Sequence, residues 1–299
     1  MAVLLAFLLT PLSPTLAQGL WWRVEGADGQ TGYLGGSIHV GSEAMYPLPE
    51  AVMVAFRQAD VLVVEIDILN TGVLEVLGKL LREGVYLDGT TLESRLDTET
   101  WALLEQVLAE FELPEWMFRW QKPWFAALNI SLLAFREAGY REDLGVDHFF
   151  LESAAASDKP VLELETVEQQ LRLFSRLSAT EQEMFLRQTL LDLEQGPHYL
   201  AAIIAAWQAG DSEAMAQLIL QQFDTPSAEG GRLHRLFIED RNRTMAEGVQ
   251  AVMEDGSTPF VVVGAGHLVG ATGLVALFRE AGYRVKPLAG TSASLAETP

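Results

Sequence analysis

Two histidines of this chain lie in turns of the same form, Gly-x-x-His: His39 follows Gly36, and His267 follows Gly264. Each turn comes directly after an apolar run typical of a strand and before a helical pattern. A third polar residue, Glu65, stands directly after four consecutive aliphatic residues. A carboxylate in that position is out of place unless partners satisfy it there. The sequence therefore singles out His39, Glu65 and His267 as candidates for one shared site.

Two imidazoles and one carboxylate form a reasonable open metal site, because they leave positions for water and substrate. A water bound to such an ion loses its proton near neutral pH and becomes a nucleophile for hydrolysis. The candidate ligands are His39, Glu65 and His267, and the candidate ions are divalent manganese, cobalt and zinc. Each residue alone also has an ordinary structural interpretation. Either histidine can be a hydrogen-bonded turn residue, and Glu65 can cap a helix or join a salt bridge.

Two segments of similar design must position these residues. Each is expected to form a strand, a Gly-x-x-His turn, a helix and a returning strand. In an open α/β sheet, ligands gather outside the carboxyl ends of the strands, where both histidines and Glu65 are predicted to lie. The expected strands are 20–24, 32–35, 61–64, 159–164, 260–263 and 284–287, and the expected helices flanking them are 49–59, 233–253 and 273–281.

The predicted fold is mixed α/β (α+β), with a central mixed sheet built from the two related units. Helical periodicity dominates 71–140 and 168–222, which we interpret as a large helical insert that covers the sheet and shapes one wall of a cleft. A single domain is expected over 18–290, followed by a disordered polar tail at 291–299.

Residues 1–17 are interpreted as a secretory signal peptide, because a short apolar run is followed by Thr15-Leu16-Ala17, a small-x-small ending. No Lys or Arg precedes that run, which leaves open a true start upstream. The alternative interpretation of the run is a buried N-terminal helix or strand. The expected location is exported, either periplasmic or secreted. No later run is long and apolar enough to predict a stable membrane span after signal removal.

Charge and composition narrow the possible partners. The formal net charge of −21 argues against nucleic acid as a partner, because phosphate binding needs clustered Lys and Arg. The chain contains no cysteine, which excludes disulfides and thiolate ligands. The expected partner is a peptide or small-molecule substrate, and the oligomeric state is not predicted.

Several blocks in fixed order resemble the TraB/GumN family, and together they span about residues 20–288. The blocks are GSIHVG at 36–41, YPLP at 46–49, VEID at 64–67, Gly145-x-Asp147, KPV at 159–161, LET at 164–166, EQ at 168–169, Arg241-Asn242, MA at 245–246 and VGAGHLVG at 263–270.

The family is similar to the Tiki proteases, which rely on two Gly-x-x-His motifs and a glutamate and need a divalent metal. More distantly it resembles the erythromycin esterases and ChaN-type haem-binding proteins. The resemblance implies catalytic and metal-binding roles for His39, Glu65 and His267. It also implies that Arg241 lies near the site as an electrophile or substrate anchor, since guanidinium binds carboxylates and oxyanions bidentately.

Four further residues are expected to support the site: Gly36, Gly264, Glu165 and Asn242. The alternative for Glu165 is a carboxylate that favours the start of a helix. The alternative for Arg241 is a surface ion pair with a neighbouring acid, Glu239 or Asp240.

The favoured functional hypothesis is an exported metal-dependent hydrolase of the Tiki-like metallopeptidase kind. Two alternatives come from other classes. One is a non-catalytic binding or regulatory protein of the cell envelope, with a part in polysaccharide export or pheromone signalling. The other is a metal-free, esterase-like hydrolase in which histidine acts as a general base on water.

Overall fold

The computed structural model describes residues 18–194, 197–221, 223 and 228–288. The predicted signal peptide at 1–17, the tail at 291–299 and the last two residues of the predicted domain lie outside the described residues. Within the described part, no helix combines the length and the apolar character needed to cross a membrane.

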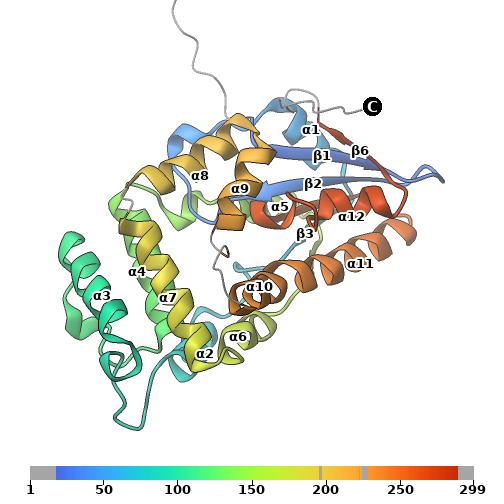
Figure 1. Cartoon of the computed structure of the whole chain (residues 1–299). Coiled ribbons are helices and arrows are strands. Elements are labelled where there is room, and N and C mark those ends of the chain that lie inside the picture. Colours follow the sequence, from blue (N-terminus) through green and yellow to red (C-terminus); the bar gives the residue numbers. More distant parts are fainter. Residues whose placement is uncertain (1–17, 195–196, 222, 224–227, 289–299) are drawn as a thin grey trace, which may run out of the picture.

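One six-stranded mixed sheet forms the centre of the described chain, in the order β4-β3-β5-β2-β1-β6 (Figure 1). The four strands β2 to β5 run parallel, and β1 runs antiparallel to both β2 and β6. The fold is therefore mixed α/β, as predicted. The strands are β1 (Leu20–Glu25), β2 (Thr31–Ser37), β3 (Val61–Val64), β4 (Val161–Glu163), β5 (Pro259–Gly264) and β6 (Arg284–Pro287).

Helices separate successive strands from β2 onward, and most of them lie between β3 and β4 or between β4 and β5. They are α1 (Glu50–Gln58), α2 (Val73–Gly84), α3 (Thr98–Glu110), α4 (Pro123–Glu137), α5 (Val146–Ala156), α6 (Val167–Ser175), α7 (Ala179–Glu194), α8 (Pro197–Ala209), α9 (Ser212–Gln221), α10 (Ala228–His234), α11 (Asp240–Glu254) and α12 (Leu274–Glu280).

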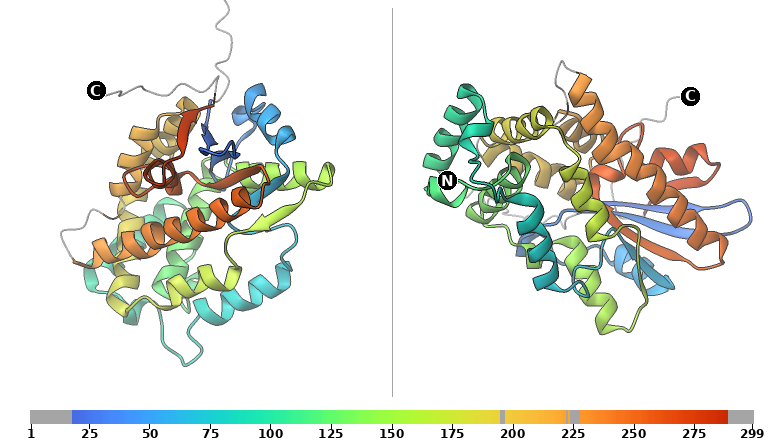
Figure 2. Two further views of the ribbon diagram at one scale, coloured as in Figure 1. Left: turned by 90° about the vertical axis from the view of Figure 1, so that its right-hand side faces the viewer. Right: turned by 90° about the horizontal axis from the view of Figure 1, so that it is seen from below.

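The two strand–turn–helix–strand segments are β2–α1–β3 and β5–α12–β6. Their first strands are direct neighbours, with Gly36 opposite Val263 and Ser37 opposite Gly264. From there β3 lies toward one side of the sheet and β6 toward the other. Because such crossovers are right-handed, this places α1 and α12 on opposite faces, as Figure 2 shows. Because β2 and β5 run parallel as neighbours, the Gly-x-x-His turns that follow them emerge at the same edge of the sheet.

Strand β4 differs from its prediction as a strand buried on both faces. It forms the edge of the sheet beside β3 alone, and Leu162 is 45% exposed. The apolar run 159–164 has the composition of a central parallel strand, but sequence does not reveal which strand of a sheet has only one neighbour. The segment after β4 still lies beside Glu65, because the Glu165 N–H donates to the Glu65 carbonyl at 3.0 Å.

The helical middle region divides into parts that pack differently. Helices α3, α4 and α7 enclose a separate hydrophobic cluster that includes Leu104, Ile130 and Leu190. Helices α8 and α9 instead contribute Trp207 and Met215 to the core of the sheet. Figures 1 and 2 show α3 at the end of the molecule away from the sheet. The insert therefore covers the sheet only in part, whereas all of it was predicted to do so.

Candidate active site

The carboxyl ends of β2, β3 and β5 bring His39, Glu65 and His267 around one small space beside Gly264. A methyl group placed on Gly264 would lie 3.3 Å from Glu65 Oε1, 3.6 Å from His39 Nε2 and 3.6 Å from His267 Cδ2. Glu65 Oε1 and His267 Nε2 are 4.0 Å apart. The three residues that were singled out from local patterns thus border the same space.

Glu65 is buried and held by several donors. Its Oε1 accepts from the Gly264 N–H at 2.6 Å, and its Oε2 accepts from Arg241 Nη2 at 2.6 Å and Gln170 Nε2 at 3.0 Å. Burial alone would raise the pKa of Glu65. The charges of His267, Arg241 and His39 and the Gly264 N–H outweigh burial and lower that pKa to about 2. Glu65 is therefore an ionised carboxylate at neutral pH.

Arg241 lies between two carboxylates. Its Nε donates to Glu165 Oε1 at 2.8 Å, and its Nη2 donates to Oε2 of Glu165 and of Glu65 at 2.6 Å each. Its Nη1 donates to the Phe237 carbonyl at 3.2 Å. Arg241 is near the site as expected, and its Nε and Nη2 donate to the protein's own carboxylates, so it is their counter-ion.

The structure does not show the alternative roles considered for Arg241 and Glu165. Glu239 and Asp240 both lie within ion-pair distance of Arg243, at 3.8 and 3.1 Å. Glu165 precedes the first turn of α6, but its side chain accepts from Arg241 and from Gln170. Glu165 is thus tied to the Glu65 site through Arg241.

Arg241 and Asn242 are neighbours on one helix and serve two different site residues. Arg241 reaches Glu65, and Asn242 Oδ1 lies 2.6 Å from His267 Nδ1. A π-helical turn, Arg235–Glu239, comes directly before α11, so the predicted helix 233–253 is α-helical only in part. Such turns change the direction in which later side chains point and are frequent at functional sites.

His267 and His39 differ in burial and in the partner of their Nδ1. His267 is 5% exposed, and burial lowers its pKa to about 4, an effect that Glu65 only partly opposes. The His39 side chain is 65% exposed, and its Nδ1 lies 3.3 Å from Asp147 Oδ2. The Asp147 carboxylate raises the pKa of His39. One imidazole is therefore buried and neutral, and the other is exposed and paired with an acid.

Asp147 was not among the residues singled out from the sequence. It lies in the first turn of α5, and its Oδ1 accepts from Ser37 Oγ at 2.6 Å. The Ser37 hydroxyl in turn accepts from the Asp147 N–H at 3.2 Å. The Gly145-x-Asp147 block was the available signal, since an acidic residue that follows a glycine at a helix start is placed to reach a neighbouring strand end.

The two predicted supporting glycines allow close packing at the site. A Cβ on Gly36 would lie 3.2 Å from the Cα of Ala265, so the two Gly-x-x-His turns touch there. The Gly36 carbonyl accepts from the buried Trp207 indole N–H at 2.7 Å, which ties α8 to the end of β2. Gly264 faces the space between the three candidate residues.

A cleft of about 490 Å³ opens beside His39 and Glu65. Asp147 and His148 line it from α5, and Ile66 and Ile68 line it from the segment after β3. The helical insert contributes Gln170 of α6, another residue that the sequence did not single out. The insert therefore does form part of the cleft wall, through one helix.

A model of the TraB/PrgY/gumN family matches residues 20–287, almost the whole described chain. The chain belongs to the TraB/PrgY/gumN family.

The chain is similar to bacterial and animal proteins. The chain is 26% identical to the "Uncharacterized protein YbaP" of Escherichia coli (strain K12), over 83% of this chain and 87% of that protein. It is 23% identical to "Metalloprotease TIKI1" of Danio rerio, over 85% of this chain and 60% of that protein. "Metalloprotease TIKI2" of the same animal is also 23% identical, over 58% of its length. No solved structure is significantly similar to the chain.

The metalloprotease names of two proteins similar to the chain raise the question of whether these side chains suit a metal ion. Among the described residues, no three His, Asp or Glu side chains are gathered closely enough to hold one as they stand. The donor chemistry nevertheless fits. Glu65 Oε1 accepts one hydrogen bond and keeps acceptor capacity. His39 Nε2 borders the space at Gly264, and His267 Nε2 lies 4.0 Å from Glu65 Oε1. His39 has the most exposed side chain of the three, at 65%.

Gly264→Ala tests the use of this space. We expect the fold to persist, because φ of Gly264 is −50° and the tightest new contact is 3.3 Å. The methyl group would fill the space between the three side chains, so any ion binding or catalysis that uses this space should fall by roughly 100-fold, as for other displacements of about 1 Å at a site. Gly78→Ala is the matched control, because no atom lies within 4 Å of its added Cβ. Equal activity in both variants would contradict the placement.

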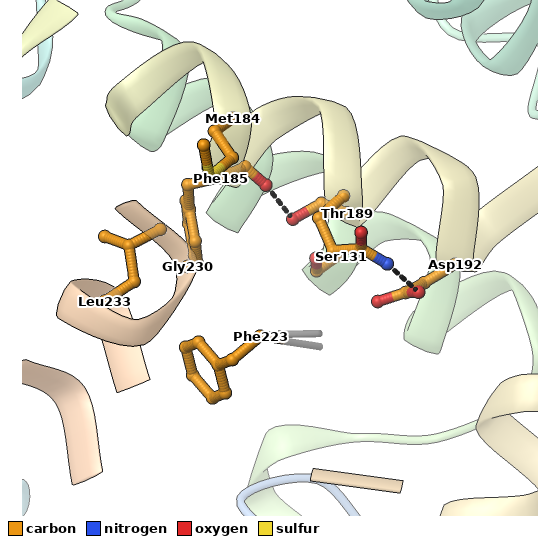
Figure 3. A pocket seen from close by; sticks show the side chains of 9 residues that line it. Ser131, Met184, Phe185, Thr189, Asp192, Phe223, Gly230 and Leu233 are labelled. Carbon is orange, nitrogen blue, oxygen red and sulfur yellow. Dashed lines mark hydrogen bonds between the residues drawn. The ribbon is translucent and has the colours of Figure 1, made fainter. Parts of the chain in front are cut away.

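A second pocket lies among α4, α7 and α10, and none of the three candidate residues lines it (Figure 3). Apolar side chains such as Phe185 and Leu233 line this pocket together with the carboxyl group of Asp192. Burial raises the pKa of Asp192 to about 6, although a hydrogen bond from Gln188 opposes this.

Asp192→Asn is expected to stabilise the protein at pH 7. A carboxyl group whose pKa is higher in the folded than in the unfolded state stabilises the fold at low pH, and that contribution is lost as pH rises from about 4 through about 6. The neutral amide avoids the loss, so we expect a gain of about 1–2 kcal/mol at pH 7, allowing for partial exposure. Urea unfolding at pH 7 and pH 4 measures it. A gain of the same size at both pH values would contradict the burial of this acid.

Proposed function

We propose that this chain is a metal-dependent hydrolase, a Tiki-like metallopeptidase in which His39, Glu65 and His267 hold a divalent ion. The observation that carries the proposal is the single small space beside Gly264 that all three side chains border. Similarity to two proteins named metalloproteases, at 23% identity, supports it. When bound, the ion would supply an activated water for attack on a peptide carbonyl.

The chain's own residues have distinct parts in this proposal. Arg241 and the Gly264 N–H keep Glu65 ionised, and Glu165 holds the guanidinium in place. Asp147 holds the His39 ring through Nδ1 and so leaves its Nε2 on the side of Gly264. Two nitrogen donors and one oxygen donor suit zinc, cobalt or manganese, and these are the ions to test.

The proposed substrate is a peptide that lies in the cleft. Ile66 and Ile68 contribute apolar side chains to the cleft lining, and α5 contributes polar ones, Asp147 and His148. We also propose that the protein acts after export, in the periplasm or outside the cell, on the strength of the apolar run and the small-x-small ending within residues 1–17.

A metal-free hydrolase is the second candidate, and the His39–Asp147 pair favours it. Asp147 lies beside His39 Nδ1, and His39 lines the cleft. A histidine held in this way is suited to act as a general base on a water molecule. In this version Glu65 and Arg241 form a charged wall of the site.

Metal titration of the purified mature protein tests the proposal. Calorimetry with Zn²⁺, Co²⁺ and Mn²⁺ should show one ion per chain, and exhaustive chelation should remove hydrolysis of a peptide library until that ion is restored. Turnover that survives chelation would favour the metal-free hydrolase. Metal binding without turnover on peptide and ester libraries would favour the non-catalytic binding protein.

A further inference from the structure

Two hydrogen bonds in series connect His267 to the loop before α12. Asn242 Nδ2 donates to the Thr272 carbonyl at 2.7 Å, and Asn242 Oδ1 lies 2.6 Å from His267 Nδ1. Asn242 is fully buried and His267 is 5% exposed, so water does not compete for either contact. Asn242 also belongs to α11, whereas Thr272 and His267 follow β5, so the amide joins two separately packed segments.

The series allows only one arrangement of protons. A backbone carbonyl can only accept, so the Asn242 NH₂ must face Thr272, and its oxygen must face the imidazole. The amide oxygen carries no hydrogen, so His267 Nδ1 must supply the proton of that bond. A neutral imidazole has one N–H only, and its Nε2 is then an unprotonated acceptor.

The opposite tautomer would be unfavourable. It would set the Nδ1 lone pair against the Asn242 oxygen at 2.6 Å, with neither group able to donate. It would also place a hydrogen on Nε2, the atom that lies 4.0 Å from Glu65 Oε1. A protonated Nε2 can neither bind a metal ion nor accept a proton.

We propose that Asn242, held by the Thr272 carbonyl, is a positioning residue that selects the Nδ1–H tautomer of His267 and thereby keeps its Nε2 available to the site. The tautomer itself follows from the contacts alone, and its consequence for metal binding rests on the proposed function. An amide suits this position, because it orients the ring without adding a third carboxylate beside the buried Glu65 and Glu165.

The tautomer can be measured in metal-free protein. Long-range ¹H–¹⁵N correlation spectra of ¹⁵N-histidine protein distinguish Nδ1–H from Nε2–H rings, and comparison with His267→Ala assigns the His267 signals among the five histidines. We expect Nδ1–H in the parent and in Asn242→Asp, which keeps an acceptor oxygen. Asn242→Ala and the nearly isosteric Asn242→Leu remove the acceptor and should populate Nε2–H. Asn129→Ala, at a helix position outside the site, should leave the parent tautomer unchanged.

An Nε2–H ring in the parent would overturn the inference by itself, even if every variant failed to fold. An unchanged tautomer in folded Asn242→Ala or Asn242→Leu would overturn it as well.

Calorimetry separates this inference from the proposed function. With Zn²⁺ we expect Asn242→Ala to bind roughly 10- to 100-fold more weakly than the parent, as is usual when the partner of a ligating histidine is removed, and Asn242→Asp to stay closer to the parent. A parent that binds no Zn²⁺, Co²⁺ or Mn²⁺ would defeat the proposed function, while the tautomer spectra would still decide the role of Asn242. Equal Zn²⁺ affinity in the parent and a folded Asn242→Ala would contradict that role.

Discussion

His39→Ala is expected to reduce peptide hydrolysis by roughly 100- to 10 000-fold while leaving the protein about as stable as the parent. The size of the loss corresponds to removal of a group that ligates an ion or moves a proton in the reaction. Stability should change little because the His39 side chain is 65% exposed and its one ion pair, with Asp147, is at the cleft surface. This variant therefore separates chemistry from folding more cleanly than any change at buried His267.

The measurement is kcat/KM on a peptide substrate together with the urea midpoint. His234→Ala is the matched control, because His234 is also a histidine paired with an acid, Glu239, but does not border the space at Gly264. Activity within a few-fold of the parent in His39→Ala would exclude this residue from the chemistry, and with it both hydrolase versions that use it.

Arg241→Met is expected to lower the free energy of unfolding by about 3–5 kcal/mol, the usual result of removing one partner from a buried ion pair. The Glu65 and Glu165 side chains are about 10% exposed, and both would lose their guanidinium partner. Two buried carboxylates would then face each other across the vacated position, and one must take up a proton or be exposed to water. Urea unfolding at pH 7 measures the loss.

Arg243→Met is the control on the same helix. Its side chain is 58% exposed and pairs with Glu239 and Asp240 at the surface, so the change should cost less than about 1 kcal/mol. Arg241→Lys should lie between the two, because an ammonium cannot span both carboxylates with the guanidinium's planar set of donors. Equal losses for Arg241→Met and Arg243→Met would show that the buried network does not stabilise the fold.

The same hydrogen bonds determine what is expected of Glu65→Gln. An amide at that position would turn an NH₂ group toward Arg241 and Gln170, which are both donors, or toward the Gly264 N–H. Glu65→Gln is therefore expected to lower the stability of the fold as well as remove the negative charge. A loss of activity in that variant alone does not identify Glu65 as a catalytic group. The sequence shows only that Glu65 follows a buried strand, and the identity of its partners comes from packing.

Local patterns were sufficient to place the three candidate residues at strand ends. Four aliphatic residues before Glu65 and the apolar run before Gly264 specify strands, and glycine at the turns permits the close contact between Gly36 and Ala265. Because parallel strands end at a common edge, the approximate meeting of His39, Glu65 and His267 follows from these patterns. The mixed α/β class follows in the same way, since helical and strand periods are properties of neighbouring residues.

Only the tertiary structure decided which polar groups satisfy one another. Arg241 meets Glu65 across 176 positions of sequence, and Ser37 meets Asp147 across 110. Local periodicity carries no information about such pairs, because they depend on how separate helices pack against the sheet edge and on a π turn that no apolar pattern marks. For the same reason the exposed edge of β4 could not be read from its composition: a strand's neighbours are set by the order of the whole sheet, and that order also decides which buried charges find partners.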